Sequence, residues 1–291
     1  MHINMKYYIV TIGAIFIALG IGILVGFNLN YDQELSKQQA NVISDLDSKF
    51  EDLKTTNDNL EESLANLSSD YDQSIEFINK NSEKIIVDGL LEKNIGIIST
   101  NESNDYTKEI EEIITKANGV LSFNIILTDN IENKEKLKEA SDNLNIEIKN
   151  TQDLINYITE CLKDVNGATK LQNLQNLELI KLNHISADYL NYESVVLIGG
   201  NESKNGNDKF KKIDEVLITK LKEENKNVVG VQKSNTKFSY TGLYSKNKVT
   251  TIDNIDEGIG QVSLVILLSE KGITGNFGRL ESADRLLPYK K

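Results

Sequence analysis

The chain has 291 residues and a formal net charge of −12 at neutral pH, with one cysteine, two histidines and two methionines. The acidic balance argues against nucleic acid as a partner and against peripheral attraction to anionic lipid, because both require a basic protein surface. A single cysteine excludes an internal disulfide, and the scarcity of thiolate, imidazole and thioether groups argues against a copper, zinc or iron site within one chain.

One long apolar segment lies near the amino terminus. From Tyr7 to Phe27 the chain has no charged residue, and a helix of this length would span about 31 Å, close to the hydrocarbon thickness of a bilayer. A cleaved export signal would have a shorter apolar core and a small-residue cleavage site, which residues 28–35 lack. We therefore predict an uncleaved anchor. Gly22 and Gly26 have the spacing that lets two helices pack closely, although glycine is also common in membrane helices generally.

The charges beside this segment predict its orientation. Lys6 precedes it, whereas Asp32 and Glu34 follow it. The positive-inside rule then places the amino terminus in the cytoplasm and the rest of the chain outside. We expect a single-pass protein of the cell membrane in which residues 1–31 form the cytoplasmic tip and the anchor.

A heptad repeat follows the anchor. Apolar residues recur at alternating intervals of three and four, with leucine at four consecutive d positions and asparagine at one a position. This pattern predicts a parallel two-stranded coiled coil over residues 32–80, and the same frame continues to Ser74 and Ile78. A helix packed on the protein's own domain is the alternative, which the polar residues at nearly all other positions disfavour. The predicted seam of the homodimer is Ile43, Leu46, Phe50, Leu53, Asn57, Leu60, Leu64, Leu67 and Tyr71.

Residues 81–291 alternate short apolar runs with amphipathic segments. This alternation predicts an extracytoplasmic α/β domain, Rossmann-like, with a mostly parallel sheet covered on both faces. The expected strands are 94–100, 120–127, 192–201 and 227–232, with a strand-to-helix turn at 248–258, and the expected helices are 105–117, 133–142, 151–163, 208–224 and 257–270.

Motifs of known enzymes do not occur in the sequence. There is no G-x-G-x-x-G, no P-loop and no G-x-S-x-G elbow. Cys161 falls on the apolar face of its predicted helix, where we expect a buried and inert thiol, and His184 has no partner motif. We therefore expect neither an enzyme nor a bound cofactor.

Two features leave ligand binding open. The turn Gly199-Gly200 could bind an anion at a helix amino terminus, although a glycine turn that simply closes a strand is more common. Asp253, Asp256 and Glu257 could bind a hard cation. We favour the interpretation that the two aspartates cap turns at the start of the following helix.

Two stretches resemble a known family. Residues 16–27 resemble the anchor, and residues 249–288 the carboxyl-terminal part, of the mycobacterial-type copper transport protein family (MctB), which includes the corynebacterial SteB proteins. The second stretch has a threonine–aspartate turn, an apolar helix, a glycine-x-aromatic-glycine element and a Leu-Leu-Pro close. The matching residues are Asp253, Gly275, Phe277, Gly278 and Pro288.

The resemblance implies an envelope protein of a copper transporter or channel family. An association with copper is therefore expected only from the family resemblance. Its SteB branch implies a SteA-like membrane partner and a role in envelope assembly or division. A conduit needs several apolar spans or a closed barrel, and this chain offers one apolar helix. Our first interpretation is therefore a non-enzymatic scaffold or interaction module in envelope assembly or division. The alternatives are a component of a copper efflux system and an extracytoplasmic ligand-binding domain.

Overall fold

The computed structural model describes residues 5–103, 105–200 and 206–289, and for residues 29–33 and 206 it describes the backbone alone. The side chain of Asp32 and residues 201–203 of the glycine turn therefore lie outside the described residues. The chain divides into Met1–Asp72, here called the helical unit, and Gln73–Lys291, here called the α/β unit.

Helix α1 (Met5–Ile86) includes every described residue of the helical unit. It continues into the first residues of the α/β unit. Its first part, Met5–Asn28, is long and apolar enough to cross a membrane, in agreement with the predicted anchor. No glycine or proline occurs between Phe27 and Ile86, so nothing in the backbone chemistry interrupts the helix. It ends just before Asp88, whose φ of 59° is left-handed.

The α/β unit is built on one seven-stranded sheet, of order β3-β2-β1-β4-β5-β6-β7. Neighbouring strands run parallel, except that β3 is antiparallel to β2. A mostly parallel sheet is thus confirmed. The strands are β1 (Asn94–Ser99), β2 (Val120–Leu127), β3 (Ile180–Ile185), β4 (Ser194–Ile198), β5 (Asn227–Val231), β6 (Thr250–Ile252) and β7 (Asn276–Phe277).

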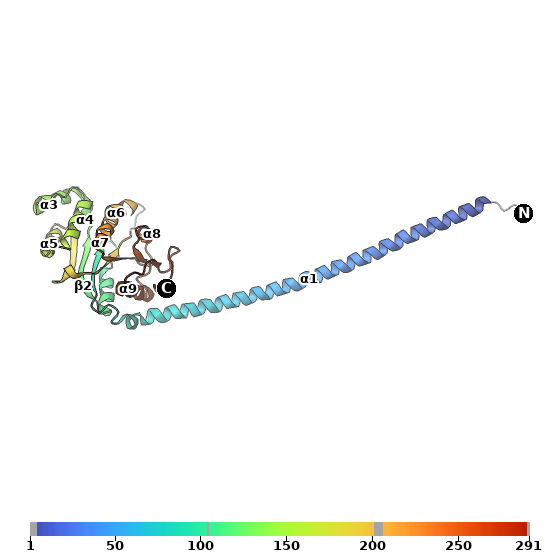
Figure 1. The fold of residues 1–291 in the computed structure, drawn as a ribbon, viewed down its shortest axis with the longest axis horizontal. Coiled ribbons are helices and arrows are strands. Elements are labelled where there is room, and N and C mark those ends of the chain that lie inside the picture. Colours follow the sequence, from blue (N-terminus) through green and yellow to red (C-terminus); the bar gives the residue numbers. More distant parts are fainter. Residues whose placement is uncertain (1–4, 104, 201–205, 290–291) are drawn as a thin grey trace. The chain divides into compact units, whose positions relative to one another are not determined.

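Helices cover both faces of this sheet (Figure 1), as the alternation of strands and helices predicts. The first apolar core lies under α3 (Lys134–Leu144), α4 (Thr151–Cys161), α5 (Gly167–Asn176), α6 (Gly206–Lys212), α7 (Asp214–Glu223) and α8 (Thr241–Lys246). The second lies under α2 (Thr107–Lys116), α9 (Gly258–Ser269) and the last turns of α1. Two short 3-10 helices are η1 (Asp129–Glu132) and η2 (Tyr189–Asn191).

The structure differs from the expected elements in several places. The predicted helix 208–224 is two helices, α6 and α7, because Ile213 leaves helical geometry with φ −118° and ψ −71°. Helices α5 and α8 and strands β3 and β7 were not predicted. Strand β3 lies at a sheet edge with most of its side chains only partly covered, so its sequence lacks the apolar run of a buried strand.

Candidate functional site

The seam of the helical unit is an exposed apolar stripe. All eight apolar side chains at its a and d positions are exposed, from 46% at Tyr71 to 73% at Phe50. Asn57 is on the same stripe, and its amide donates a hydrogen bond of 2.9 Å to Glu61 Oε1 one turn later. Helices in water owe most of their stability to packing of an apolar face, so a stripe of this length calls for a partner surface.

The apolar segment Met5–Asn28 is also exposed on all sides. Its large apolar side chains between Met5 and Phe27 are 53% to 73% exposed. A Cβ atom added at Gly22 or Gly26 would meet nothing within 4 Å, so the surface at both glycines is free to receive another helix. An apolar surface on every side of a helix is what lipid requires.

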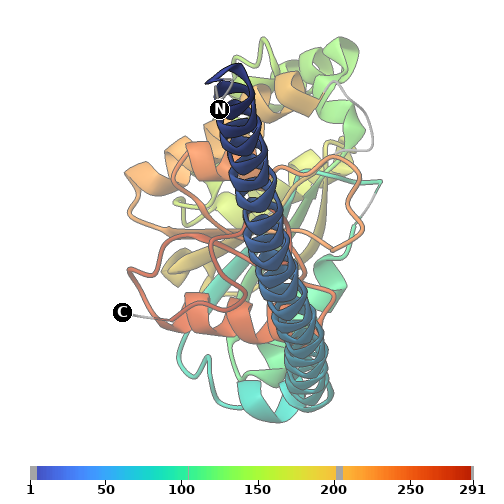
Figure 2. The same ribbon diagram turned by 90° about the vertical axis from the view of Figure 1, so that its right-hand side faces the viewer.

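The last turns of α1 pack instead on the α/β unit, beside α9 (Figure 2). Ile75 and Ile86 are 7% and 1% exposed. Asn79 Oδ1 accepts a 2.9 Å hydrogen bond from the backbone N–H of Ile259, at the start of α9. A Cβ at Gly258 would lie 2.6 Å from the Cα of Asn79, so this contact requires glycine. Asn79 therefore acts as a helix cap supplied from a distant part of the chain.

Asp253 and Gly278 of the carboxyl-terminal motif form one structural unit. The Asp253 carboxylate accepts hydrogen bonds from the backbone N–H groups of Arg279 (2.8 Å) and Leu280 (2.9 Å). Gly278 has φ +135°, and a side chain there would collide with that carboxylate. Asp253 thus fastens the carboxyl-terminal segment to the end of β6 rather than capping the following helix. We call this contact the C-terminal clasp.

Asp256 likewise does not cap the following helix, so the capping interpretation of both aspartates is wrong. Its carboxylate accepts hydrogen bonds from the backbone N–H (2.8 Å) and hydroxyl (2.6 Å) of Ser234. Glu257 pairs with Arg279, at 2.9 Å between Oε2 and Nε. The partners of Asp256 and Glu257 thus come from two segments distant in sequence. The pattern of one local turn could not predict these contacts.

The other motif residues shape the same segment. Gly275 has φ +145°, a conformation that favours glycine. Phe277 is 3% exposed in the second core, within β7, and Pro288 is buried near the chain end. The motif is therefore brought together in space, and its residues contact protein groups.

The carboxyl ends of β1 and β4 are where open parallel sheets usually bind ligands. Here they hold a buried polar network. Asp214 Oδ1 accepts hydrogen bonds from the hydroxyls of Thr100 (3.0 Å) and Tyr244 (2.7 Å). Burial raises the pKa of Asp214 to about 6, against the opposing effect of these two hydrogen bonds. No sequence pattern predicts this network, and an aspartate inside the predicted helix 208–224 is its one visible sign.

Cys161 and His184 lie in unlike surroundings. Cys161 is 1% exposed, as predicted, and burial raises the pKa of its thiol to about 11. His184 is exposed on β3, with Nε2 3.1 Å from the carbonyl oxygen of Leu121. Within residues 5–103, 105–200 and 206–289, no three His, Cys, Asp or Glu side chains converge as metal ligands.

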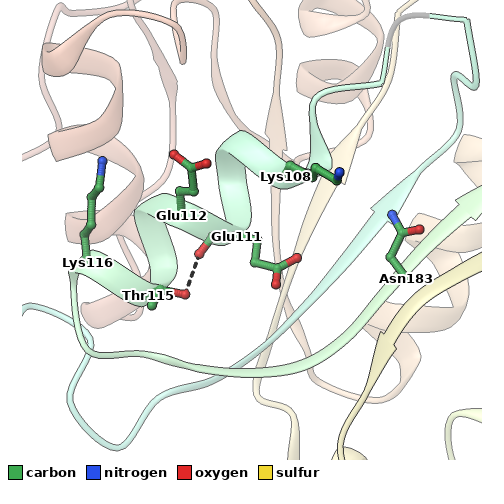
Figure 3. A pocket seen from close by; sticks show the side chains of 6 residues that line it. All are labelled: Lys108, Glu111, Glu112, Thr115, Lys116 and Asn183. Carbon is green, nitrogen blue, oxygen red and sulfur yellow. Dashed lines mark hydrogen bonds between the residues drawn. The ribbon is translucent and has the colours of Figure 1, made fainter.

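A cleft of about 550 Å³ opens between α2 and β3 (Figure 3). Glu111 and Asn183 lie on its two sides, whereas Glu112 and Lys116 point away from Asn183. Glu111 Oε2 accepts a 3.1 Å hydrogen bond from the buried amide of Asn124, and Lys116 pairs with Glu83 at 2.8 Å. The lining carries charges of both signs, so the cleft has no clear ligand preference.

A family model described as copper transport outer membrane protein, MctB, matches residues 2–288. The match runs through the apolar segment, the heptad repeat, the sheet and the C-terminal clasp. No curated protein matches the chain.

Proposed function

The chain belongs to the MctB family, described as copper transport outer membrane proteins, and from this premise we propose that it is a dimeric, non-enzymatic envelope scaffold. Membership confirms the resemblance drawn from the anchor and the carboxyl-terminal motif. It also makes the chain a copper-transport-related envelope protein. The scaffold role, the dimer and the orientation are our proposals.

The exposed seam carries the proposal. A second, parallel copy would cover the eight exposed a and d side chains with their own counterparts. Burying one leucine side chain fully contributes roughly 1.5–3 kcal/mol, so a seam of several leucines stabilises a pair of helices strongly. Asn57 at an a position favours two strands in one register.

The proposed topology places the amino terminus in the cytoplasm and the α/β unit outside the membrane. Lys6 at the amino-terminal end of Met5–Asn28 and Glu34 beyond its carboxyl-terminal end support this orientation through the positive-inside rule. In this arrangement a coiled coil joins the membrane to a Rossmann-like domain that offers its surface to other envelope proteins, among them a SteA-like membrane partner.

The interior of the α/β unit supports a role without catalysis. The hydroxyls of Thr100 and Tyr244 both donate hydrogen bonds to Asp214 at the sheet edge where nucleotide-binding folds hold their ligand. The motif residues Asp253 and Gly278 hold the chain's own carboxyl-terminal segment. Recognition by the surface is then the activity that the proposal assigns to this unit.

The alternative function is a component of a copper efflux or transport system, which the family description favours. Copper would then be cargo. Because Cys161 is buried with a raised pKa, this chain would contribute to transport through oligomers or partners rather than through a thiolate of its own.

The dimer is tested by replacing Leu53, Leu60 and Leu67 with glutamine in the full chain and measuring its mass in detergent by light scattering. We expect the wild type to be a dimer and the triple variant a monomer. A matched control replaces Thr55 and Glu62, at f positions of the same frame, with glutamine and should remain dimeric. A wild-type chain that is already monomeric would refute the proposed dimer.

The two functions are separated in a deletion strain. A scaffold of envelope assembly predicts a cell-separation defect at unchanged copper tolerance, whereas a transport component predicts sensitivity to copper. Complementation with the triple leucine variant tells whether dimerisation is needed for either phenotype. Copper sensitivity without a separation defect would overturn the scaffold in favour of transport.

A further inference from the structure

The α/β unit has an exposed apolar patch near the end of α1. Among its described residues eight large apolar side chains are exposed, and five of them lie between Phe77 and Val120. The N–H of Val120 donates to the carbonyl of Lys93 at 2.8 Å, so the start of β2 lies beside the turn that follows α1. We name the five residues the basal patch: Phe77 (65% exposed), Ile85 (46%), Val87 (53%), Leu91 (56%) and Val120 (46%).

The basal patch is separate from the face by which α1 packs on its own domain. The stripe by which α1 packs on the domain is formed by Ile75, Asn79, Ser82 and Ile86, spaced four, three and four. Asn79 is half-buried and the other three side chains are buried. At about 100° per residue these positions share one side of the helix. Ile85 and Phe77 fall outside that stripe, and their exposure agrees with this geometry. The last turns of α1 therefore carry a second apolar surface that the domain leaves uncovered.

The heptad frame indicates what covers this surface. Counting on from Ile43 by sevens reaches Ile78 and then Ile85, so Ile85 is an a position of the same frame, and Phe77 is the g position before Ile78. In a parallel two-stranded coiled coil each a side chain packs against its counterpart, and g side chains flank the seam. A second copy in this frame would place Ile85 against Ile85 of that copy.

From these observations we infer that the two α/β units of a dimer contact each other through the basal patch. The inference rests on the proposed dimer and adds to it that the seam extends past Tyr71 to Ile85. The domains are then held side by side at the end of the coiled coil, with Val87, Leu91 and Val120 extending the contact beyond the helix. Apolar patches of this kind on an otherwise polar domain typically mark a protein interface.

Cysteine cross-linking distinguishes this inference from the dimer itself. In a full-length Cys161→Ser background, single variants Leu53→Cys, Ile85→Cys and Glu76→Cys are treated with a short bismaleimide. Glu76 is the matched control, since it is exposed on the same turns but at an f position. We expect cross-linked dimer from Leu53→Cys and Ile85→Cys and none from Glu76→Cys. Cross-linking at position 53 alone overturns the domain contact and leaves the dimer intact, whereas its absence at position 53 refutes the dimer.

A second measurement uses dissociation of the full chain in detergent. Ile85→Asp should raise the dimer dissociation constant at least tenfold, because two carboxylates would face each other across the seam. Val165→Asp is the matched control, an apolar residue 78% exposed on the same unit but outside the basal patch, and should change it less than twofold. Circular dichroism verifies that both variants fold. Equal effects of the two substitutions would overturn the inference.

Discussion

The two units of the chain use the same kinds of apolar side chain differently, and α1 shows the difference within one helix. In the helical unit its seam residues are 46% to 73% exposed, whereas in the α/β unit Ile75 and Ile86 are 7% and 1% exposed. The helix itself is continuous from Met5 to Ile86. Helix formation is therefore a local property here. How much an apolar face of the helix contributes to stability depends on the surface that packs against it. Four substitutions test that contrast.

The largest effect should come from truncating a leucine that already has partners. Leu264 in α9 is completely buried, and Leu264→Ala should lower the free energy of unfolding of the α/β unit by about 3–4 kcal/mol through lost contacts and a cavity. Leu60→Ala, at a leucine that is 57% exposed, should change it by less than about 0.5 kcal/mol. Denaturant titrations followed by near-ultraviolet circular dichroism of the tyrosines measure both. A similar cost at the two leucines would contradict the contrast between the units.

The next largest effect should be the change with pH in the contribution of Asp214 to stability. Its pKa is about 6 in the folded chain against 3.8 for the ordinary carboxyl, so the folded state binds more protons between these values. Its contribution to stability is present below about pH 4 and is lost as the pH rises through about 6, a change of about 3 kcal/mol. Asp214→Asn should remove this loss, so the variant gains on the wild type between pH 4 and 7. Denaturant unfolding of the wild type and of Asp214→Asn at pH 4 and at pH 7 tests this prediction, with the exposed Asp208→Asn as the control. If the two proteins differ by the same free energy of unfolding at both pH values, the pKa of Asp214 is not raised.

Breaking the C-terminal clasp should have a smaller but local effect. Asp253→Ala leaves the N–H groups of Arg279 and Leu280 without their carboxylate acceptor, which should cost about 2 kcal/mol. We also expect faster proteolysis between residues 278 and 285. Asp256→Ala is the control, because its bonds to Ser234 lie at the surface, and it should cost less than about 1 kcal/mol. Equal protease sensitivity of the two variants would contradict the clasp.

The smallest effect on stability is expected from removing the contact of α1 with the start of α9. Asn79→Ala removes the side-chain acceptor for the Ile259 N–H, and loss of a helix cap costs about 1 kcal/mol. Asn81→Ala removes only a bond to the Phe77 carbonyl of the same helix and should leave the unfolding of the α/β unit almost unchanged. Thermal unfolding resolves the two, and a shift for Asn81→Ala as large as that for Asn79→Ala would show that the cap is not specific.

Much of the fold followed from patterns within short windows. The apolar face Ile110, Ile113 and Ile114 predicted α2, and the apolar runs at 94–100 and 120–127 predicted its flanking strands. The pattern gave no sign of α8, which has six residues, or of the edge strand β3. The pattern also could not divide helix 208–224 at Ile213. The break there depends on the contacts of Asp214 with Thr100, just after β1, and with Tyr244 of α8, both distant in sequence.

For the candidate site the division is similar. The heptad frame of the seam is visible in the sequence, since an α-helix brings residues three and four apart onto one face. The stripe by which α1 docks on its domain was not separated from that frame, because Asn79 is a cap only in contact with Ile259, 180 positions away. The roles of Asp253 and Asp256 were misassigned for the same reason.

The sequence by itself determined the apolar span, the long uninterrupted helix with its heptad repeat, and the alternation that makes a parallel sheet, because each depends on neighbours within a few residues. Only the tertiary structure decided that Asp253 fastens residues 279–280, that Asp214 is buried beneath Thr100 and Tyr244, and that α1 presents one face to its own domain and leaves another open. Those outcomes join segments 26 to 180 residues apart. A hydrogen bond over such a separation forms only once the whole core has brought its two partners together.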